Sequence, residues 1–499
     1  MLDNDSLLQV LIQCRLQHGE NWNVRLRWLK LAHVCRRWRY LIYDSLSVLD
    51  MCLHLRNDSH SIDALSHLPP LPLVIHYSDR RRTTTVARKD EDNILLGLQQ
   101  HSRVRRVILQ APSSSLRIWL EPMNKLFPIL EDLSLLASTI KGMDLILPET
   151  LQAPNLYRLS LHGINLSATL PLLSSAIALS TLSLTHIGAS CYFSPKHLVT
   201  QLQGLPHLEE LSIGFAIPIP LPSSERELLP EPIPPVTLFT LRRLTFRGVD
   251  VYLDNLVAQI NTPLLEQLSL TLLFDLTFSL ANLTQFIHRT EELGCLVARV
   301  TFSEDGAFID AGNHKQRGIG KLSLRVSCEP LDWQIDSATQ VCIALGDVLS
   351  TVEELTIDLD ERGMPSGWEN LLDGMLWHEL LLPFVGVKKL HIGSSLTLEL
   401  SRALQSDSGG LFLELLPGLQ ELEVRVRVGR AKKGFYAFKE SRESAGRPVF
   451  ICITDERPSS PNIFPKRFGP NPTPSGHHPR SLRRAGAVAR MRPTRSEMV

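Results

Sequence analysis

Two short segments resemble parts of catalytic motifs, but each lacks a residue that the chemistry needs. Gly320-Lys321 matches the end of a phosphate-binding loop, yet Lys315 stands where the first glycine of the loop is required. His378-Glu379 begins like the helical motif of zinc proteases, but Leu382 occupies the position of the second histidine. Two imidazoles therefore cannot share one helical face there. Neither a nucleotide site nor a zinc site is predicted.

A third segment, Gly393-Ser394-Ser395, places a serine after a glycine as in a nucleophile elbow, but no closing glycine follows. The 17 histidines are dispersed, and the 8 cysteines include no C-x-x-C pair. We therefore predict no catalytic residue, no metal ligand and no cofactor. An enzyme is an alternative only if its site is assembled from residues distant in the sequence.

Composition and charge narrow the classes to which the chain can belong. It has 499 residues, of which 43% are hydrophobic and 21% charged, as in folded proteins. Lysine plus arginine and aspartate plus glutamate both total 52, so we expect no nucleic-acid partner. Scattered cysteines, an acidic start and the lack of an apolar run of about 18 residues predict an intracellular protein, cytoplasmic or nuclear, without a membrane partner.

Residues 1–50 are predicted to be helical. Apolar residues recur at helical spacing in two stretches, the first behind a cap at Asp3 or Asp5. A unit this small buries too little apolar surface to be stable alone, so we expect it to expose an apolar face to a neighbouring domain or a partner. The apolar positions are Leu8, Leu11 and Ile12, then Leu31, Val34, Cys35 and Trp38.

Residues 51–100 are predicted to form a linker and the first strand of the next domain. Pro69-Pro70 interrupts the chain, and the run from Leu71 to Ile75 is typical of a strand. The basic stretch from Asp79 to Lys89 is predicted to be a solvated loop, with nucleic-acid contact as the alternative.

Residues 101–429 repeat one pattern twelve times: an apolar residue, two variable ones, an apolar residue, one variable and an apolar one. The starts lie 22 to 35 residues apart, which overlaps the period of leucine-rich repeats, about 20 to 29 residues. Each unit predicts a strand whose apolar side chains face a core shared with its neighbours. The starts are Val104, Leu130, Leu156, Leu179, Leu208, Leu241, Leu265, Val297, Ile319, Val352, Val387 and Leu419.

The residue between the last two apolar positions is expected on the opposite, concave face of a parallel sheet. It carries a hydroxyl group in nine successive repeats, which fits small or β-branched residues on a crowded surface better than hydroxyl-based chemistry. This hydroxyl column comprises Ser134, Ser160, Ser183, Ser212, Thr245, Ser269, Thr301, Ser323 and Thr356, and His391 and Glu423 follow.

Two segments depart from the repeat pattern. Residues 217–236 are rich in proline and predict a surface loop, with a docking role as the alternative. Residues 431–499 contain 14 lysines and arginines against 5 acidic residues, together with many prolines. We expect a disordered tail, and nuclear import or nucleic-acid contact is a side hypothesis for its arginines.

The first zone resembles an F-box. The residues that carry the resemblance are the segment from Leu2 to Leu11 and the segment from His33 to Ile42, which includes Val34-Cys35-Arg36-Arg37-Trp38-Arg39. With the later segment from Leu68 to Ile75, the chain is similar to F-box proteins with degenerate leucine-rich repeats, which are abundant in fungi. Asp3 departs from the family, which usually has proline after the leading leucine.

The resemblance implies a non-catalytic subunit of a ubiquitin ligase. In that family the F-box binds a Skp-family adaptor, which leads through a cullin to a RING subunit and a ubiquitin-conjugating enzyme. The receptor acts by holding a substrate lysine near the charged enzyme. We expect half of the matching residues to pack internally and half to face the adaptor: Leu2, Leu7, Leu8, Leu11, Leu31, Val34, Cys35 and Trp38.

An unidentified protein substrate is expected to bind the repeats. Basic residues at outward positions are predicted to lie on adjacent strands and to form a concave patch for an acidic or phosphorylated segment. The alternative is a solvated face of mixed charge. The residues of this predicted basic patch are Arg243, Arg247, Arg299, Lys321 and Arg325.

The predicted fold class is therefore α+β. It comprises an F-box at 1–50, a linker and first strand at 51–100, an irregular leucine-rich-repeat-like α/β solenoid at 101–429 and a tail at 430–499. The predicted function is a substrate-recognition adaptor of a Skp-cullin-F-box ubiquitin ligase in ubiquitin-dependent degradation. The alternative is a leucine-rich-repeat interaction scaffold without ligase coupling.

Overall fold

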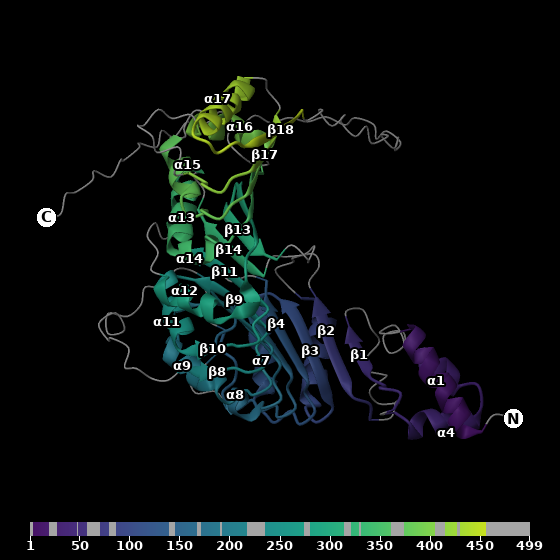
Figure 1. Ribbon diagram of the computed structural model, residues 1–499. Coiled ribbons are helices and arrows are strands. Elements are labelled where there is room, and N and C mark those ends of the chain that lie inside the picture. The colour runs from purple at the N-terminus through teal and green to yellow at the C-terminus, as the bar shows by residue number, and fades with distance from the viewer. Residues whose placement is uncertain are drawn as a thin grey trace, which may run out of the picture. The chain divides into compact units, whose positions relative to one another are not determined.

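A large, mostly parallel β-sheet with helices packed against it makes up most of the chain that the structure describes (Figure 1). This mixed α/β architecture agrees with the predicted α+β class. The computed structural model describes residues 3–18, 27–46, 48–56, 70–78, 86–138, 145–166, 171–189, 192–216, 235–273, 280–313, 321–328, 331–360, 374–404, 415–426 and 430–455.

Sixteen strands join this sheet in the order β1-β2-β3-β4-β5-β6-β7-β9-β11-β14-β13-β12-β15-β16-β17-β18, while β8 and β10 form a separate parallel pair. The strands are β1 (Leu53–Arg56), β2 (Leu73–Ser78), β3 (Val104–Ala111), β4 (Asp132–Ala137), β5 (Arg158–His162), β6 (Thr181–Ile187), β7 (Glu210–Phe215), β8 (Val236–Thr237), β9 (Arg243–Gly248), β10 (Ile260–Asn261), β11 (Gln267–Leu273), β12 (Val297–Ser303), β13 (Gly306–Gly312), β14 (Leu322–Ser327), β15 (Glu354–Leu359), β16 (Lys389–Ile392), β17 (Glu421–Val426) and β18 (Phe450–Asp455).

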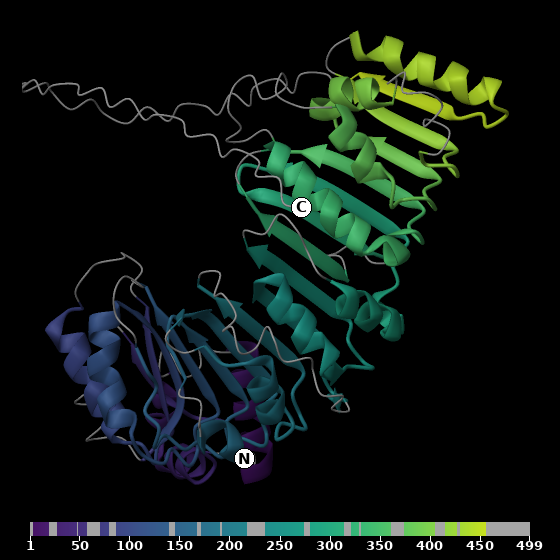
Figure 2. The same cartoon turned by 90° about the vertical axis from the view of Figure 1, so that its left-hand side faces the viewer.

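Helices lie between many successive strands, and those of the green and yellow part of the chain cover one face of the sheet (Figure 2). The helices are α1 (Asn4–His18), α3 (Arg27–Ala32), α4 (Arg36–Asp44), α6 (Arg88–Gln99), α7 (Ser113–Leu120), α8 (Pro171–Ser175), α9 (Pro195–Leu202), α11 (Asp250–Ala258), α12 (Ala281–Arg289), α13 (Leu331–Ala344), α14 (Gly346–Leu349), α15 (Gly374–Leu381), α16 (Thr397–Ala403) and α17 (Arg430–Ser444).

Alternating burial along the strands places the core between sheet and helices. In β9, Leu244 and Phe246 are buried, whereas Arg243, Thr245 and Arg247 are exposed. Successive side chains of a strand point to opposite faces, so one face is apolar and the other polar. We call the polar face, which carries the hydroxyl column, the open face. The predicted inward and outward positions are confirmed at this strand.

The first helix begins where the sequence predicts a cap. The Ser6 backbone N–H donates to Asp3 Oδ1 at 2.6 Å, which satisfies a donor that the helix leaves unpaired. This hydrogen bond and one from the Ser6 hydroxyl lower the pKa of Asp3 below its ordinary value. The second predicted helical stretch is divided into α3 and α4, with Cys35 at the N-cap of α4.

One strand that the repeat pattern does not predict changes the sheet order. β13 pairs antiparallel with both β12 and β14, so the chain runs up β12, down β13 and up β14 before it continues to β15. As a result β11 pairs with β14, and β12 pairs with β15. The expected parallel arrangement of the sheet is wrong at β13, which carries no copy of the repeat.

The described fold also continues past the predicted start of the tail. α17 packs Phe435 and Phe438 into the core, and β18 pairs with β17. The predicted boundary at 430 is therefore wrong, since an apolar stripe in α17 supplies the core contact that the basic composition hides. Residues 456–499 lie outside the described residues.

Two predicted loops also need correction. Arg88 and Lys89 are the first residues of α6 and do not belong to a loop, and Val236 begins β8. The rest of the proline-rich insertion, residues 217–234, lies outside the described residues, as do residues 79–85 of the basic stretch.

Candidate functional site

The N-terminal helices divide the residues matched to the F-box into two groups. Leu7 and Leu11 are buried, at 3% and 0% exposure, and support the core. Val34 is 60% exposed, and Cys35 is exposed beside it. Of the remaining predicted residues, Leu8, Leu31 and Trp38 are half-buried and pack against the core, and Leu2 lies outside the described residues.

Further apolar side chains of this unit reach solvent. Tyr40 of α4 is 69% exposed, and Leu16 and Val10 of α1 are 63% and 44% exposed. The predicted adaptor-facing residues do not include these three; Tyr40 lies two residues after Trp38 and therefore on another side of α4. Large apolar side chains exposed on a small helical unit are candidates for contact with a partner protein.

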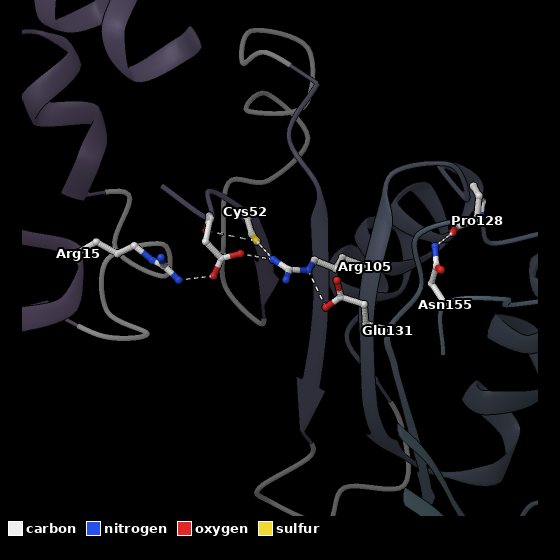
Figure 3. Close-up of polar contacts among 7 residues, drawn as sticks. Arg15, Cys52, Arg105, Pro128, Glu131 and Asn155 are labelled. Atoms are coloured by element: carbon white, nitrogen blue, oxygen red, sulfur yellow. Dashed lines mark hydrogen bonds and ion pairs between the residues drawn. The ribbon is translucent and has the colours of Figure 1, made fainter. Parts of the chain in front are cut away.

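A chain of ion pairs joins α1 to the sheet (Figure 3). Arg15 of α1 lies 2.7 Å from Asp50, which also pairs with Arg105 of β3. Arg105 Nε donates to Glu131 at 2.8 Å. Burial opposes the charge of Arg105, but its hydrogen bonds to Asp50 and Glu131 outweigh that effect and raise its pKa. The helical unit is thus coupled to the first strands of the sheet.

The hydroxyl column is continuous across the parallel strands. Direct register partners run Ser134, Ser160, Ser183, Ser212, Thr245, Ser269 and Ser323. On the far side of β13 the column continues through Thr356, His391 and Glu423. Because most of these side chains are half-buried on the open face, they form a narrow polar strip rather than a core.

One member of the predicted column is wrong. Thr356 pairs in register with Arg299, whereas Thr301 pairs with Asp358 two positions further along. The repeat therefore starts at Cys295, which is 2% exposed, and not at Val297. The apolar pattern can begin at either Val297 or Cys295. It also fits from Cys295 because the small residue Ala298 is buried at the second apolar position.

The predicted basic patch is dispersed and largely neutralised. In the sheet order, β9 with Arg243 and Arg247 is separated by three strands from β12 with Arg299, so these residues do not lie on adjacent strands as expected. Arg243 pairs with Glu210. Lys321 lies 3.0 Å from Glu292, and Arg325 lies 3.5 Å from Asp305 and over the Phe308 ring.

A polar pocket of about 210 Å³ opens on the same face at β12, β15, β16 and β17. His391 is its centre, with Nε2 at 3.1 Å from Glu354 and Nδ1 at 2.9 Å from Glu423. A glutamate oxygen therefore lies within hydrogen-bond distance of each ring nitrogen. Arg299, Asp358 and Arg425 also line the pocket, so it can hold a polar group of a partner. The sequence marked His391 and Glu423 only as exceptions in the hydroxyl column.

Comparison with known proteins assigns no family to this chain. A scan against protein-family models found no match, and a search of the curated proteins found none. Within the described ranges, no three histidine, cysteine or acidic side chains are grouped so that they could hold a metal ion. The helices of the described segments are all too short or too polar to cross a membrane.

Proposed function

We propose that this chain is a substrate-recognition adaptor of a Skp-cullin-F-box type ubiquitin ligase. Its N-terminal helices would bind a Skp-family adaptor, and the open face of the sheet would recruit a protein substrate. The chain would contribute no catalytic side chain. Its effect would be positional, because holding a lysine near the charged conjugating enzyme raises the effective concentration of the two reactants.

The observation that carries this proposal is the exposed apolar surface of the small helical unit. Val34 and Tyr40 are 60% and 69% exposed, although Leu7 and Leu11 of the same helical unit are buried. Solvent exposure of large apolar groups on so small a unit is unfavourable unless a partner covers them. The resemblance of this segment to an F-box supplies the identity of that partner.

The open face supports the second half of the proposal. Its strands present a polar strip, mixed ion pairs and the pocket around His391. A polar surface with many orienting groups suits specific but reversible protein recognition. The leucine-rich-repeat-like arrangement of strands and helices belongs to the same proposal.

Co-purification of a Skp-family adaptor with the full chain tests the proposal. We expect the double variant V34D/Y40D to lose adaptor capture at least about tenfold, because two charges enter an apolar contact. Neither side chain is buried, so the variant should retain the melting temperature of the parent. I177D is the matched control, since Ile177 is 61% exposed outside the helical unit and should leave capture unchanged.

The capture measurements decide between the ligase-adaptor function and the scaffold alternative. Capture by the parent and by I177D, but not by V34D/Y40D, supports the adaptor function. A folded parent chain that captures no adaptor contradicts it and favours the scaffold alternative.

A further inference from the structure

Three nitrogen-bearing side chains converge on the open face of β5, β6 and β9. The rings of His162 and His186 have centroids 4.4 Å apart, and His162 Nδ1 lies 2.9 Å from Thr185 Oγ1. Arg247 approaches from β9 across Gly214 of β7, with which it is in register. From the sequence, Arg247 is predicted to belong to another patch, and no residue pattern connects it with His186.

Gly214 leaves space at the centre of this group. A Cβ built at Gly214 would lie 3.5 Å from Arg247 Cβ and 3.5 Å from Thr185 Cγ2. Any larger side chain would extend into the space between the arginine and the threonine. The glycine therefore keeps the approach to the arginine and imidazole groups open.

Local backbone conformation brings His186 into the group. Its φ is 56°, in the left-handed region that non-glycine residues rarely adopt, and the register between β6 and β7 shifts between Leu184 and Ile187. Bulges of this kind re-aim side chains and are frequent near functional sites. Conformational strain held at a polar cluster is a reason to look for a ligand there.

Arg247 supplies the positive charge of this cluster. Among the described residues, no carboxylate pairs with His162, His186 or Arg247. Burial, then His186 and Arg247, lower the pKa of His162, while burial and then Arg247 lower the pKa of His186. Burial and the neighbouring positive charge thus favour the neutral form of each ring.

Charged groups on the neighbouring strands do not supply a negative charge to this cluster. Asp132, Arg158, Glu210 and Arg243 stand at the starts of β4, β5, β7 and β9. Each lies four residues along its strand from the level of the cluster, a distance of about 13 Å. Glu210 and Arg243 already pair with each other, and Arg325, on the strand beyond β11, pairs with Asp305.

We propose that His162, His186 and Arg247 form a binding site for a phosphate-type oxyanion, either inorganic phosphate or the phosphate monoester of a phosphorylated side chain. A phosphate group carries up to two negative charges and three acceptor oxygens, which matches one guanidinium and two imidazoles. A bound dianion stabilises the imidazolium forms, so binding takes up protons. Affinity for a phosphate monoester should therefore rise as the pH falls from 8 to about 6.5, before the monoester itself protonates with a second pKa of about 6. Recruitment of a phosphorylated substrate through this site rests on the proposed function, but anion binding does not.

Calorimetric titration of the full chain tests the site with three probes: inorganic phosphate, capped phosphoserine and capped glutamate. We expect inorganic phosphate and phosphoserine to bind, phosphoserine more tightly at pH 6.5 than at pH 8, and glutamate to bind much more weakly. Tighter binding of phosphoserine than of inorganic phosphate would identify a phosphorylated side chain as the source, and the reverse order would identify the free ion. Absence of phosphate binding, or equal binding of glutamate, would overturn the proposal.

Three variants and one control locate the site. R247Q should weaken phosphate binding by about tenfold to a hundredfold, as expected for loss of a charge-assisted hydrogen bond. H186G should weaken it while relieving the positive φ, so that misfolding cannot explain the loss, and G214V should block the space. R243Q is the matched control, because Arg243 lies on the same strand but is paired with Glu210. Equal losses in R243Q and R247Q would contradict the assignment. Adaptor capture is measured separately, so failure of this site and failure of the ligase function are distinguishable.

Discussion

Asp50 lies at the turn between α4 and β1 and combines an unusual backbone conformation with two ion pairs. Its φ is 47°, and its carboxylate pairs with Arg15 and Arg105. Aspartate and asparagine tolerate the left-handed region better than other residues with a Cβ. The same residue thus sets the direction of the chain and joins the helical unit to the sheet.

Replacement of Asp50 separates these two roles. D50A should lower the free energy of unfolding by about 2 kcal/mol, since it loses partly exposed ion pairs and a side chain suited to positive φ. D50N keeps the backbone preference and should cost about 1 kcal/mol. Urea denaturation measures both values, and variants as stable as the parent would show that neither contact matters.

The pH dependence of stability follows from the lowered pKa values of His162 and His186. Both lie below the ordinary 6.5, so the unfolded chain binds protons at a higher pH than the folded chain does. Stability contributed by the neutral rings is present above pH 6.5 and is lost as the pH falls toward the folded pKa.

H186G should therefore reduce the loss of stability between pH 7 and pH 5, relative to the parent chain. Melting temperatures recorded across this range without phosphate measure the effect. H207Q, which changes an exposed histidine, should keep the parental slope. An unchanged slope in H186G would mean that His186 is not held neutral by its surroundings.

At the scale of elements, α17 is attached to the sheet by a buried charge. Arg442 is 1% exposed and donates to the carbonyl oxygens of Leu415, Leu416 and Leu419 at 3.3 Å each. These carbonyls belong to the turn before β17. The guanidinium therefore replaces water for backbone groups that would otherwise be buried without a donor.

R442A should destabilise the region of α17 and β18 by about 3 kcal/mol, because several buried carbonyls lose a charged donor. Hydrogen exchange of the β18 amides should accelerate, while that of β4 and β5 should not. K439A removes only an exposed pair with Glu443 at 3.6 Å and should cost less than about 0.5 kcal/mol. Equal exchange in R442A and the parent would contradict this role.

At the scale of the whole described sheet, β13 joins two runs of parallel strands. One run extends from β1 through β14 in the sheet order, and the other extends from β12 to β18. Gly306 begins β13 with a φ of 144°, and a Cβ there would lie 2.1 Å from the Val326 carbonyl oxygen. No side chain can be accommodated without moving the backbone of β14.

G306A should therefore weaken the pairing of β13 with β14 and lower the stability by at least about 2 kcal/mol. Because the two runs of strands lose their connection, we expect unfolding in two transitions instead of one. Circular dichroism during urea denaturation distinguishes these cases. G346A is the control, since a Cβ at Gly346 meets no atom within 4 Å and should stabilise α14 slightly. A single transition in G306A at the parental midpoint would refute the prediction.

The alternation of apolar and variable residues determined which side chains of most repeats face the core. Leu244 and Phe246 are buried and Thr245 is exposed because strand geometry sends successive side chains to opposite faces, whatever the strand's neighbours are. The same local rule places Ser160, Ser183 and Ser212 in one column. Local periodicity is sufficient for these assignments.

Only the tertiary structure decided which strands are neighbours and which charges meet. The pairing of β11 with β14, the register that replaces Thr301 by Arg299, and the ion pairs that neutralise much of the predicted basic patch all depend on contacts between distant segments. The approach of His186 to His162 depends on a bulge and a positive φ that no residue pattern marks. Periodicity specifies a face for each residue, whereas pairing energy depends on residues far apart in the chain, and so the candidate sites emerged only from the folded sheet.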